Sequence, residues 1–208
     1  MTSVDPQFSA PSPGHWRRYR TLYAVIAVCL APVVASYLAF YVFPPSGRTN
    51  YGTLITPTPV PAMPLAHLDG RAFSFDELAG KWTMVVAAGG SCNERCAAAL
   101  LQMRQQRLMT GKERERVERV WLITDDAAPS PALLRDFEGT HLVRAAAGPT
   151  SAFLVGDGGN PEGHVWLVDP MGNLMLRWPR EPEPQRVKKD LARLLTASSH
   201  WVRIERKD

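Results

Sequence analysis

The hydrophobic residues of this chain form one long uncharged run near the start and a series of short runs after residue 64. The long run covers residues 21–43 and consists mostly of Ala, Val, Leu, Ile and aromatic residues. At about 1.5 Å per helical residue, it is long enough for the ~30 Å hydrocarbon core of a bilayer. Pro32 lies in its middle, where a membrane helix tolerates a kink. The pattern predicts one transmembrane helix at residues 21–43, in contact with the lipid bilayer.

Three arginines, Arg17, Arg18 and Arg20, precede this run. Basic residues favour the cytoplasmic side, so residues 1–20 are expected to form a cytoplasmic tail. The C-terminal part is then expected to lie on the opposite side of the membrane. The alternative is a cleavable signal peptide. The leader before Arg17 is long for one, and no Ala-x-Ala site follows the run, which favours a retained anchor. Cys29, within the run, is expected to be a small apolar side chain.

Residues 44–64 are rich in proline, with a Pro-Pro-Ser-Gly sequence at their start and alternating prolines from Pro57 to Pro61. Proline lacks the N–H that a helix or a strand ladder needs. The segment is therefore predicted to be an extended, semi-rigid linker without helix or ladder. It would hold a domain at residues 65–197 off the bilayer, and residues 198–208 would form a C-terminal tail.

The short apolar runs of the predicted domain alternate between strand and helix patterns. Residues 82–88 and 117–124 indicate buried strands, and residues 92–109 and 182–195 indicate helices. The remaining predicted elements are two short strands within 65–74, a short helix at 131–137, a strand at 141–144, a glycine-rich loop at 148–163 and a hairpin at 164–168 and 173–178. This order predicts an α/β fold.

Cys92 and Cys96 are the only cysteines outside the apolar run. They lie where the strand at 82–88 passes through a Gly-Gly-Ser turn into the first long helix, a place where the helix dipole favours thiolate over thiol. On a helix, side chains at i and i+4 share one face with Cβ atoms ~5–6 Å apart. The two sulfurs could therefore close to a disulfide, or together hold a soft ion such as Cu(I).

Composition excludes two other functions. After residue 44 the chain carries 21 basic and 19 acidic side chains, which is too even for a nucleic-acid-binding surface. A structural zinc site would need a second cysteine pair, which the sequence lacks.

The predicted order of elements, with thiols at the start of the first helix, resembles the thioredoxin-like fold, and within it the Sco/SenC group of membrane-tethered copper and redox proteins. The segments that carry the resemblance are Leu68-Asp69-Gly70-Arg71, Gly80-Lys81-Trp82, Cys92 with Cys96, Trp121-Leu122-Ile123-Thr124-Asp125-Asp126 and Trp166-Leu167-Val168-Asp169-Pro170-Met171-Gly172.

The resemblance implies a thioredoxin-like domain on the periplasmic side of a bacterial inner membrane that serves cytochrome c oxidase assembly. Its partners would be an oxidase subunit or assembly factors. It implies Cu(I) carriage on Cys92, Cys96 and His164, or reduction of the oxidase's copper-site cysteines by the thiol pair. The sequence departs from the family pattern, because it lacks proline beside the cysteines and places His164 three residues from the position that alignment indicates.

Two alternatives remain open at this point. Cys92 and Cys96 could form a purely structural disulfide in a non-catalytic module that docks onto a respiratory membrane complex. His164 could be a half-exposed strand residue with local hydrogen bonds. If the protein is an enzyme, it is at most a thiol–disulfide oxidoreductase.

Overall fold

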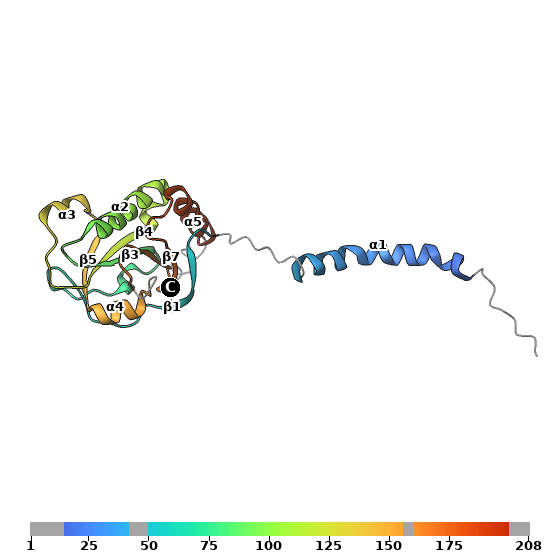
Figure 1. Ribbon diagram of the computed structural model, residues 1–208, viewed down its shortest axis with the longest axis horizontal. Helices are drawn as coiled ribbons and strands as arrows, with labels where there is room; N and C mark the ends of the chain where they lie inside the picture. Colours follow the sequence, from blue (N-terminus) through green and yellow to red (C-terminus); the bar gives the residue numbers. More distant parts are fainter. Residues whose placement is uncertain (1–14, 42–49, 156–159, 200–208) are drawn as a thin grey trace, which may run out of the picture. The chain divides into compact units, whose positions relative to one another are not determined.

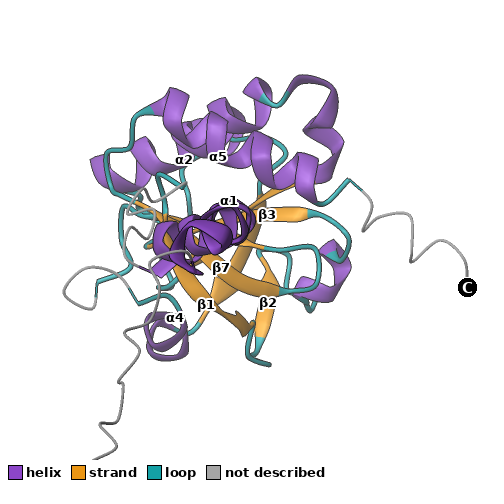
Figure 2. Ribbon diagram, turned by 90° about the vertical axis from the view of Figure 1, so that its right-hand side faces the viewer, coloured by secondary structure: helices purple, strands orange, loops and turns teal. Residues whose placement is uncertain are grey.

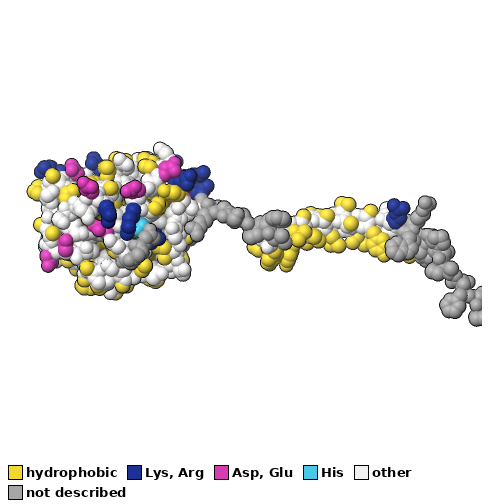
Figure 3. Space-filling model, in the orientation of Figure 1, with side chains coloured by type: hydrophobic (Ala, Val, Ile, Leu, Met, Phe, Trp, Pro, Cys, Tyr) yellow, Lys and Arg dark blue, Asp and Glu magenta, His cyan; other side chains and the backbone are white. Residues whose placement is uncertain are grey.

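The computed structural model describes residues 15–41, 50–155 and 160–199. They belong to two compact units, Met1–Arg48 and Thr49–Asp208. The first unit holds helix α1 (His15–Tyr41), which continues through Pro32 (Figure 1). Its stretch Tyr19–Tyr41 is long and apolar enough to cross a membrane, as a signal sequence near an N-terminus can also be. Its apolar side chains are exposed, as the yellow surface in Figure 3 shows.

The predicted cytoplasmic tail lies largely outside the described residues, as do the last two residues of the predicted span and most of the C-terminal tail.

The second unit is built on a seven-stranded mixed sheet with helices on both faces (Figure 2). The strands are β1 (Thr53–Pro59), β2 (Leu65–His67), β3 (Trp82–Ala88), β4 (Val117–Ile123), β5 (His141–Ala145), β6 (Val165–Val168) and β7 (Asn173–Trp178). The helices are α2 (Glu94–Met109), α3 (Pro131–Asp136), α4 (Ala147–Phe153), α5 (Pro184–Ala197) and the 3₁₀ turns η1 (Phe75–Leu78) and η2 (Gly111–Arg116). The α/β prediction is confirmed.

Strand β3 lies at the centre of the sheet, whose order is β1-β7-β6-β3-β4-β5-β2. It pairs in parallel with β4 and antiparallel with β6. All seven residues of β3 are buried, which explains its continuous apolar sequence, because a central strand covered on both faces has no solvent side. Helices α2 and α5 cover one face, and α4 lies over the other (Figure 2).

Helix α2 packs on the sheet through a stripe of small and apolar residues. Cys96, Ala99, Leu100 and Met103 follow the i, i+3, i+4, i+7 spacing, and each is at most 1% exposed. They join the buried side chains of β3 and β4 in one core cluster. This packing fixes the start of α2 against the end of β3.

The prediction that residues 44–64 form no ladder is wrong. Residues 53–59 form β1, which pairs antiparallel with β7 at one edge of the sheet, with a register shift between Leu54 and Thr58. An edge strand bonds on one side only and tolerates a bulge, so Pro57 and Pro59 can lie in it without breaking a ladder. The folded unit therefore starts before Leu65.

Two smaller predictions also change. Part of the glycine-rich segment predicted to be a loop, residues 147–153, is helix α4. Of the two short strands predicted between residues 65 and 74, only β2 forms, and Ala72 makes an isolated bridge to Ala66. In α4, the Thr150 hydroxyl donates to the carbonyl oxygen of Ala146. The hydrophobic pattern of the sequence does not predict this hydrogen bond.

Asp190 of α5 ties the segment before β1 to the core. Its side chain is buried, and its two carboxylate oxygens accept the backbone N–H groups of Tyr51, at 3.0 Å, and Gly52, at 2.8 Å. A buried carboxylate is stable only when such donors satisfy it. This contact anchors Tyr51 and Gly52, which lead into β1, on α5.

We expect Asp190→Ala to lower the free energy of unfolding by about 2–3 kcal/mol, because two buried N–H groups lose a charged acceptor. Asp190→Asn, which keeps one acceptor oxygen, should lose about half as much. The measurement is chemical unfolding of the full chain in detergent micelles, followed by near-UV circular dichroism. The exposed Asp136→Ala is the matched control and should unfold with the parent.

Candidate redox site

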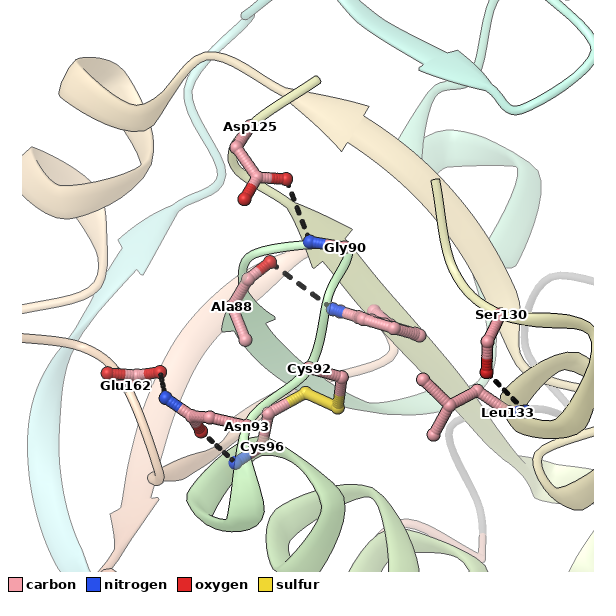
Figure 4. The surroundings of a disulfide bond; sticks show 10 residues. Ala88, Gly90, Cys92, Asn93, Cys96, Asp125, Ser130, Leu133 and Glu162 are labelled. Carbon is pink, nitrogen blue, oxygen red and sulfur yellow. Dashed lines mark hydrogen bonds between the residues drawn. A yellow bond between two sulfur atoms is a disulfide. The ribbon is translucent and has the colours of Figure 1, made fainter. Parts of the chain in front are cut away.

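Cys92 and Cys96 are joined by a disulfide at the start of α2, with their Cα atoms 5.2 Å apart (Figure 4). The prediction that the two sulfurs lie close enough to bond is thereby confirmed. Cys96 lies in the first turn of the helix, and Cys92 precedes the helix by two residues.

The two cysteines differ in accessibility. Cys96 is completely buried and belongs to the core cluster beneath α2. Cys92 is partly exposed and packs against the rim of the same cluster. Cys92 is therefore the member of the pair nearer to solvent, and Cys96 is the member within the core.

Asn93 starts the helix. Its side-chain Oδ1 accepts the backbone N–H of Cys96 at 3.0 Å, which satisfies one of the free donors of the first turn. The sequence predicted a helix that begins at Cys92, and the structure begins it at Glu94 because Asn93 is the cap. The pair thus lies at the positive end of the α2 dipole, which favours the thiolate form once the disulfide is reduced.

The turn before Cys92 is fixed by Asp125, at the end of β4. The Asp125 Oδ1 accepts the backbone N–H of Gly90 at 2.7 Å (Figure 4). It also accepts the backbone N–H of Ala127 at 3.2 Å. Ser130, rather than either aspartate after β4, caps α3.

A third segment, residues 160–164, contacts the start of α2 at Asn93 and Arg95. Asn93 Nδ2 donates to Glu162 Oε1 at 2.6 Å (Figure 4). A Cβ added to Gly163 would lie 3.6 Å from the Cβ of Arg95, so the two backbones pass closely. Sequence reasoning missed Glu162, because 69 residues separate it from Asn93 and Glu162 itself belongs to no recognisable motif.

His164 directly precedes β6 and is completely buried, rather than half-exposed. Its Nδ1 lies 2.9 Å from the carbonyl oxygen of Trp178, which can only accept, so Nδ1 carries the proton. Its ring packs edge-on against Trp166, with centroids 5.9 Å apart. These contacts fix the ring inside the domain.

A family model described as "Transmembrane-like, thioredoxin-like, C-terminal domain" matches residues 82–198, more than half of the chain. The chain belongs to this family. The match begins with β3 and includes the disulfide and α5, so the thioredoxin-like fold predicted from the order of elements is confirmed. No curated protein matches the chain.

Solved structures with the same fold include Sco proteins and thiol–disulfide exchange proteins. Copper-bound yeast Sco1 is 14% identical, with 73% of this chain and 96% of that chain covered at a TM-score of 0.51. A SCO1/SenC family lipoprotein from Bacillus anthracis str. Ames is 17% identical, covering 68% and 99%, with a TM-score of 0.50. A thiol:disulfide interchange protein from Bacteroides sp. is 15% identical, covering 69% and 91%, with a TM-score of 0.50. At these identities the likeness shows the fold alone.

In this oxidised form of the thioredoxin-like domain, the expected ligand set does not fit copper. Within residues 15–41, 50–155 and 160–199, no three His, Cys, Asp or Glu side chains are grouped so as to hold a metal ion. The sulfurs of Cys92 and Cys96 are bonded to each other and offer no thiolate. Copper binding by Cys92, Cys96 and His164 stays a prediction for the reduced protein.

We expect Gly90→Ala to destabilise the thioredoxin-like domain by about 1–3 kcal/mol, because the added Cβ would overlap the backbone carbonyl oxygen of Ala127. The turn before Cys92 would have to move to relieve the overlap. Gly148→Ala is the matched control, because a Cβ there meets no atom within 4 Å. It should stay within about 0.5 kcal/mol of the parent in chemical unfolding. Equal losses in the two variants would contradict the close approach.

Proposed function

We propose that this protein is a membrane-tethered thiol–disulfide oxidoreductase in which Cys92 exchanges with a target protein and Cys96 resolves the intermediate. The observation that carries the proposal is the unequal exposure of the two cysteines: Cys92 is partly exposed, and Cys96 is buried at the start of the same helix. A purely structural staple needs no accessible sulfur. Membership of a thioredoxin-like family supports the same chemistry.

In the reducing direction, the Cys92 thiolate attacks one sulfur of a target disulfide. The target S–S bond breaks, a mixed disulfide forms, and the second target sulfur leaves as a thiolate that takes a proton. The Cys96 thiolate then attacks the Cys92 sulfur, which reforms the Cys92–Cys96 bond and releases the first target sulfur. Two electrons pass to the target, and an external dithiol reductant must supply them again.

The finer form of the proposal concerns place and target. The arginines before the apolar helix support a domain on the periplasmic face of a bacterial inner membrane. The resemblance to Sco/SenC proteins supports a role in cytochrome c oxidase assembly, with the oxidase's copper-site cysteines as the target. A partly exposed sulfur on a tethered domain suits a target held in the same membrane.

The two cysteines should behave differently in a trapping experiment. With Cys29→Ser as the background, so that no third thiol reacts, reduced Cys96→Ser should accumulate a stable mixed disulfide with a disulfide-bonded model peptide, because the resolving sulfur is missing. Cys92→Ser should accumulate at least tenfold less, because the buried Cys96 cannot be reached. Mass spectrometry of the intact full chain in detergent micelles measures both products.

Equal trapping by the two variants would contradict the assigned roles. A redox titration of the parent against glutathione tests the alternative of a scaffold with a structural disulfide. A potential below about −300 mV would indicate such an inert bridge.

Copper delivery is a second candidate, favoured by one observation: a solved structure with this fold is Sco1 with copper bound. In the reduced protein, two thiolates at one helix start would suit Cu(I) as cargo. Cys92, Cys96 and His164 are then the proposed ligands, and His164 offers Nε2 because Nδ1 carries the proton.

For this candidate, the reduced full chain should retain one Cu(I) against a moderate competitor such as bicinchoninate. Cys92→Ser and Cys96→Ser should each weaken retention at least tenfold, because each removes a soft ligand. His164→Ala tests the third ligand, with His67→Ala as the control histidine. If the parent itself loses all copper to the competitor, copper delivery is excluded and the exchange proposal stands.

A further inference from the structure

Asn93 is held at both ends of its side chain. Its Oδ1 binds the N–H of Cys96, and its Nδ2 donates to the Glu162 carboxylate at 2.6 Å. This hydrogen bond is exposed to solvent, and its charged acceptor makes it stronger than a neutral bond in the same place. The side-chain amide of Asn93 therefore joins the backbone of Cys96 to the loop that precedes β6.

Other hydrogen bonds hold this loop, residues 160–164, in place. Arg180 donates to the backbone carbonyl of Glu162 at 3.2 Å and to that of Asn160 at 3.4 Å. The N–H of Glu162 donates to the side chain of Asn160 at 2.9 Å. His164 N–H bonds the Pro161 carbonyl at 3.4 Å. The loop backbone is thus held in one shape, and Glu162 is the side chain that connects it to the start of α2.

Two contacts hold the backbone of Cys92: the disulfide to Cys96, and the turn before it, in which the Cys92 N–H bonds the carbonyl of Gly89 at 3.1 Å. Cys92 has φ +47°, and among described residues it is the sole non-glycine with positive φ. Left-handed backbone is costly for a residue with a Cβ and persists only where the surroundings impose it. Opening the ring removes the covalent constraint. After reduction the turn alone holds this φ, and Asn93, the next residue, links Cys92 to the fixed start of α2.

From these contacts we propose that Glu162 is a positioning residue for the exchange at Cys92 and Cys96. Through Asn93 it holds residues 160–164 on the oxidised pair, and the contact weakens when Cys92 relaxes after reduction. A contact that is stronger in one redox state stabilises that state. Glu162 therefore favours the disulfide and makes the pair a stronger reductant. This inference rests on the proposed exchange function and adds a residue that tunes it.

The test is the equilibrium of the full chain with glutathione in detergent micelles, with Cys29→Ser as background. Glu162→Ala should shift the equilibrium about fivefold toward the dithiol, which is about 20 mV at 29.6 mV per tenfold change. Glu162→Gln keeps an acceptor oxygen and should stay within about twofold of the parent. Glu181→Ala, an exposed carboxylate farther along the chain, is the matched control and should not shift the equilibrium.

A purely electrostatic effect of the Glu162 carboxylate predicts different results for the two variants. If the Glu162 carboxylate acted by repelling the thiolates, Gln and Ala would shift the equilibrium equally, and the pH midpoint of Cys92 alkylation in the reduced protein would fall in both variants. That result overturns the positioning role. An unmoved midpoint with rescue by Gln supports it. Near-UV circular dichroism confirms that each variant is folded.

The results distinguish the role of Glu162 from the exchange function on which it rests. If the parent equilibrates with glutathione and Glu162→Ala does not differ from it, the role of Glu162 is overturned and the exchange function stands. If the parent pair does not equilibrate at all, both the exchange function and the role of Glu162 are overturned.

Discussion

The burial of Cys96 in the first turn of α2 is the constraint on which the site depends. Because this sulfur belongs to the core cluster, the helix start cannot slide or rotate without disturbing the packing of α2 on β3 and β4. Cys92, two residues before the helix, is then placed at the rim of the core, at a distance that a disulfide can span. One buried and one partly exposed cysteine follow from a single packing arrangement.

Strand polarity assembles the rest of the site. β4 runs parallel to β3, so the end of β4 with Asp125 lies beside the end of β3 and its Gly-Gly turn. β6 runs antiparallel to β3, so the start of β6 and the loop before it lie at the carboxyl end of β3. Three segments far apart in the sequence therefore converge around the cysteine pair. Ligand and active sites commonly occur at the carboxyl ends of central parallel strands for this reason.

Disulfide exchange and copper delivery both begin with the reduction of this pair. The oxidised form offers a target the Cys92 side of a disulfide, and the reduced form offers two thiolates at a helix N-terminus. The same sulfurs would serve either function, so the balance between them depends on how strongly the surroundings favour the oxidised state. The contact between Asn93 and Glu162 lies beside the pair, and its proposed effect is on this balance.

Local pattern was enough to predict the apolar helix, the buried strands β3 and β4, and the cysteine pair at a strand-to-helix junction, because periodicity and composition act over a few residues. It failed for β1, because the prolines indicated that no strand would form, whereas a strand at the edge of a sheet tolerates proline. It also failed for Glu162, Asp125 and the burial of His164, which depend on contacts between segments distant in sequence. The sequence by itself determined which atoms could carry the chemistry. Only the tertiary structure decided which sulfur is accessible and which side chains hold it, because burial and hydrogen-bond partners are set by packing across the sheet.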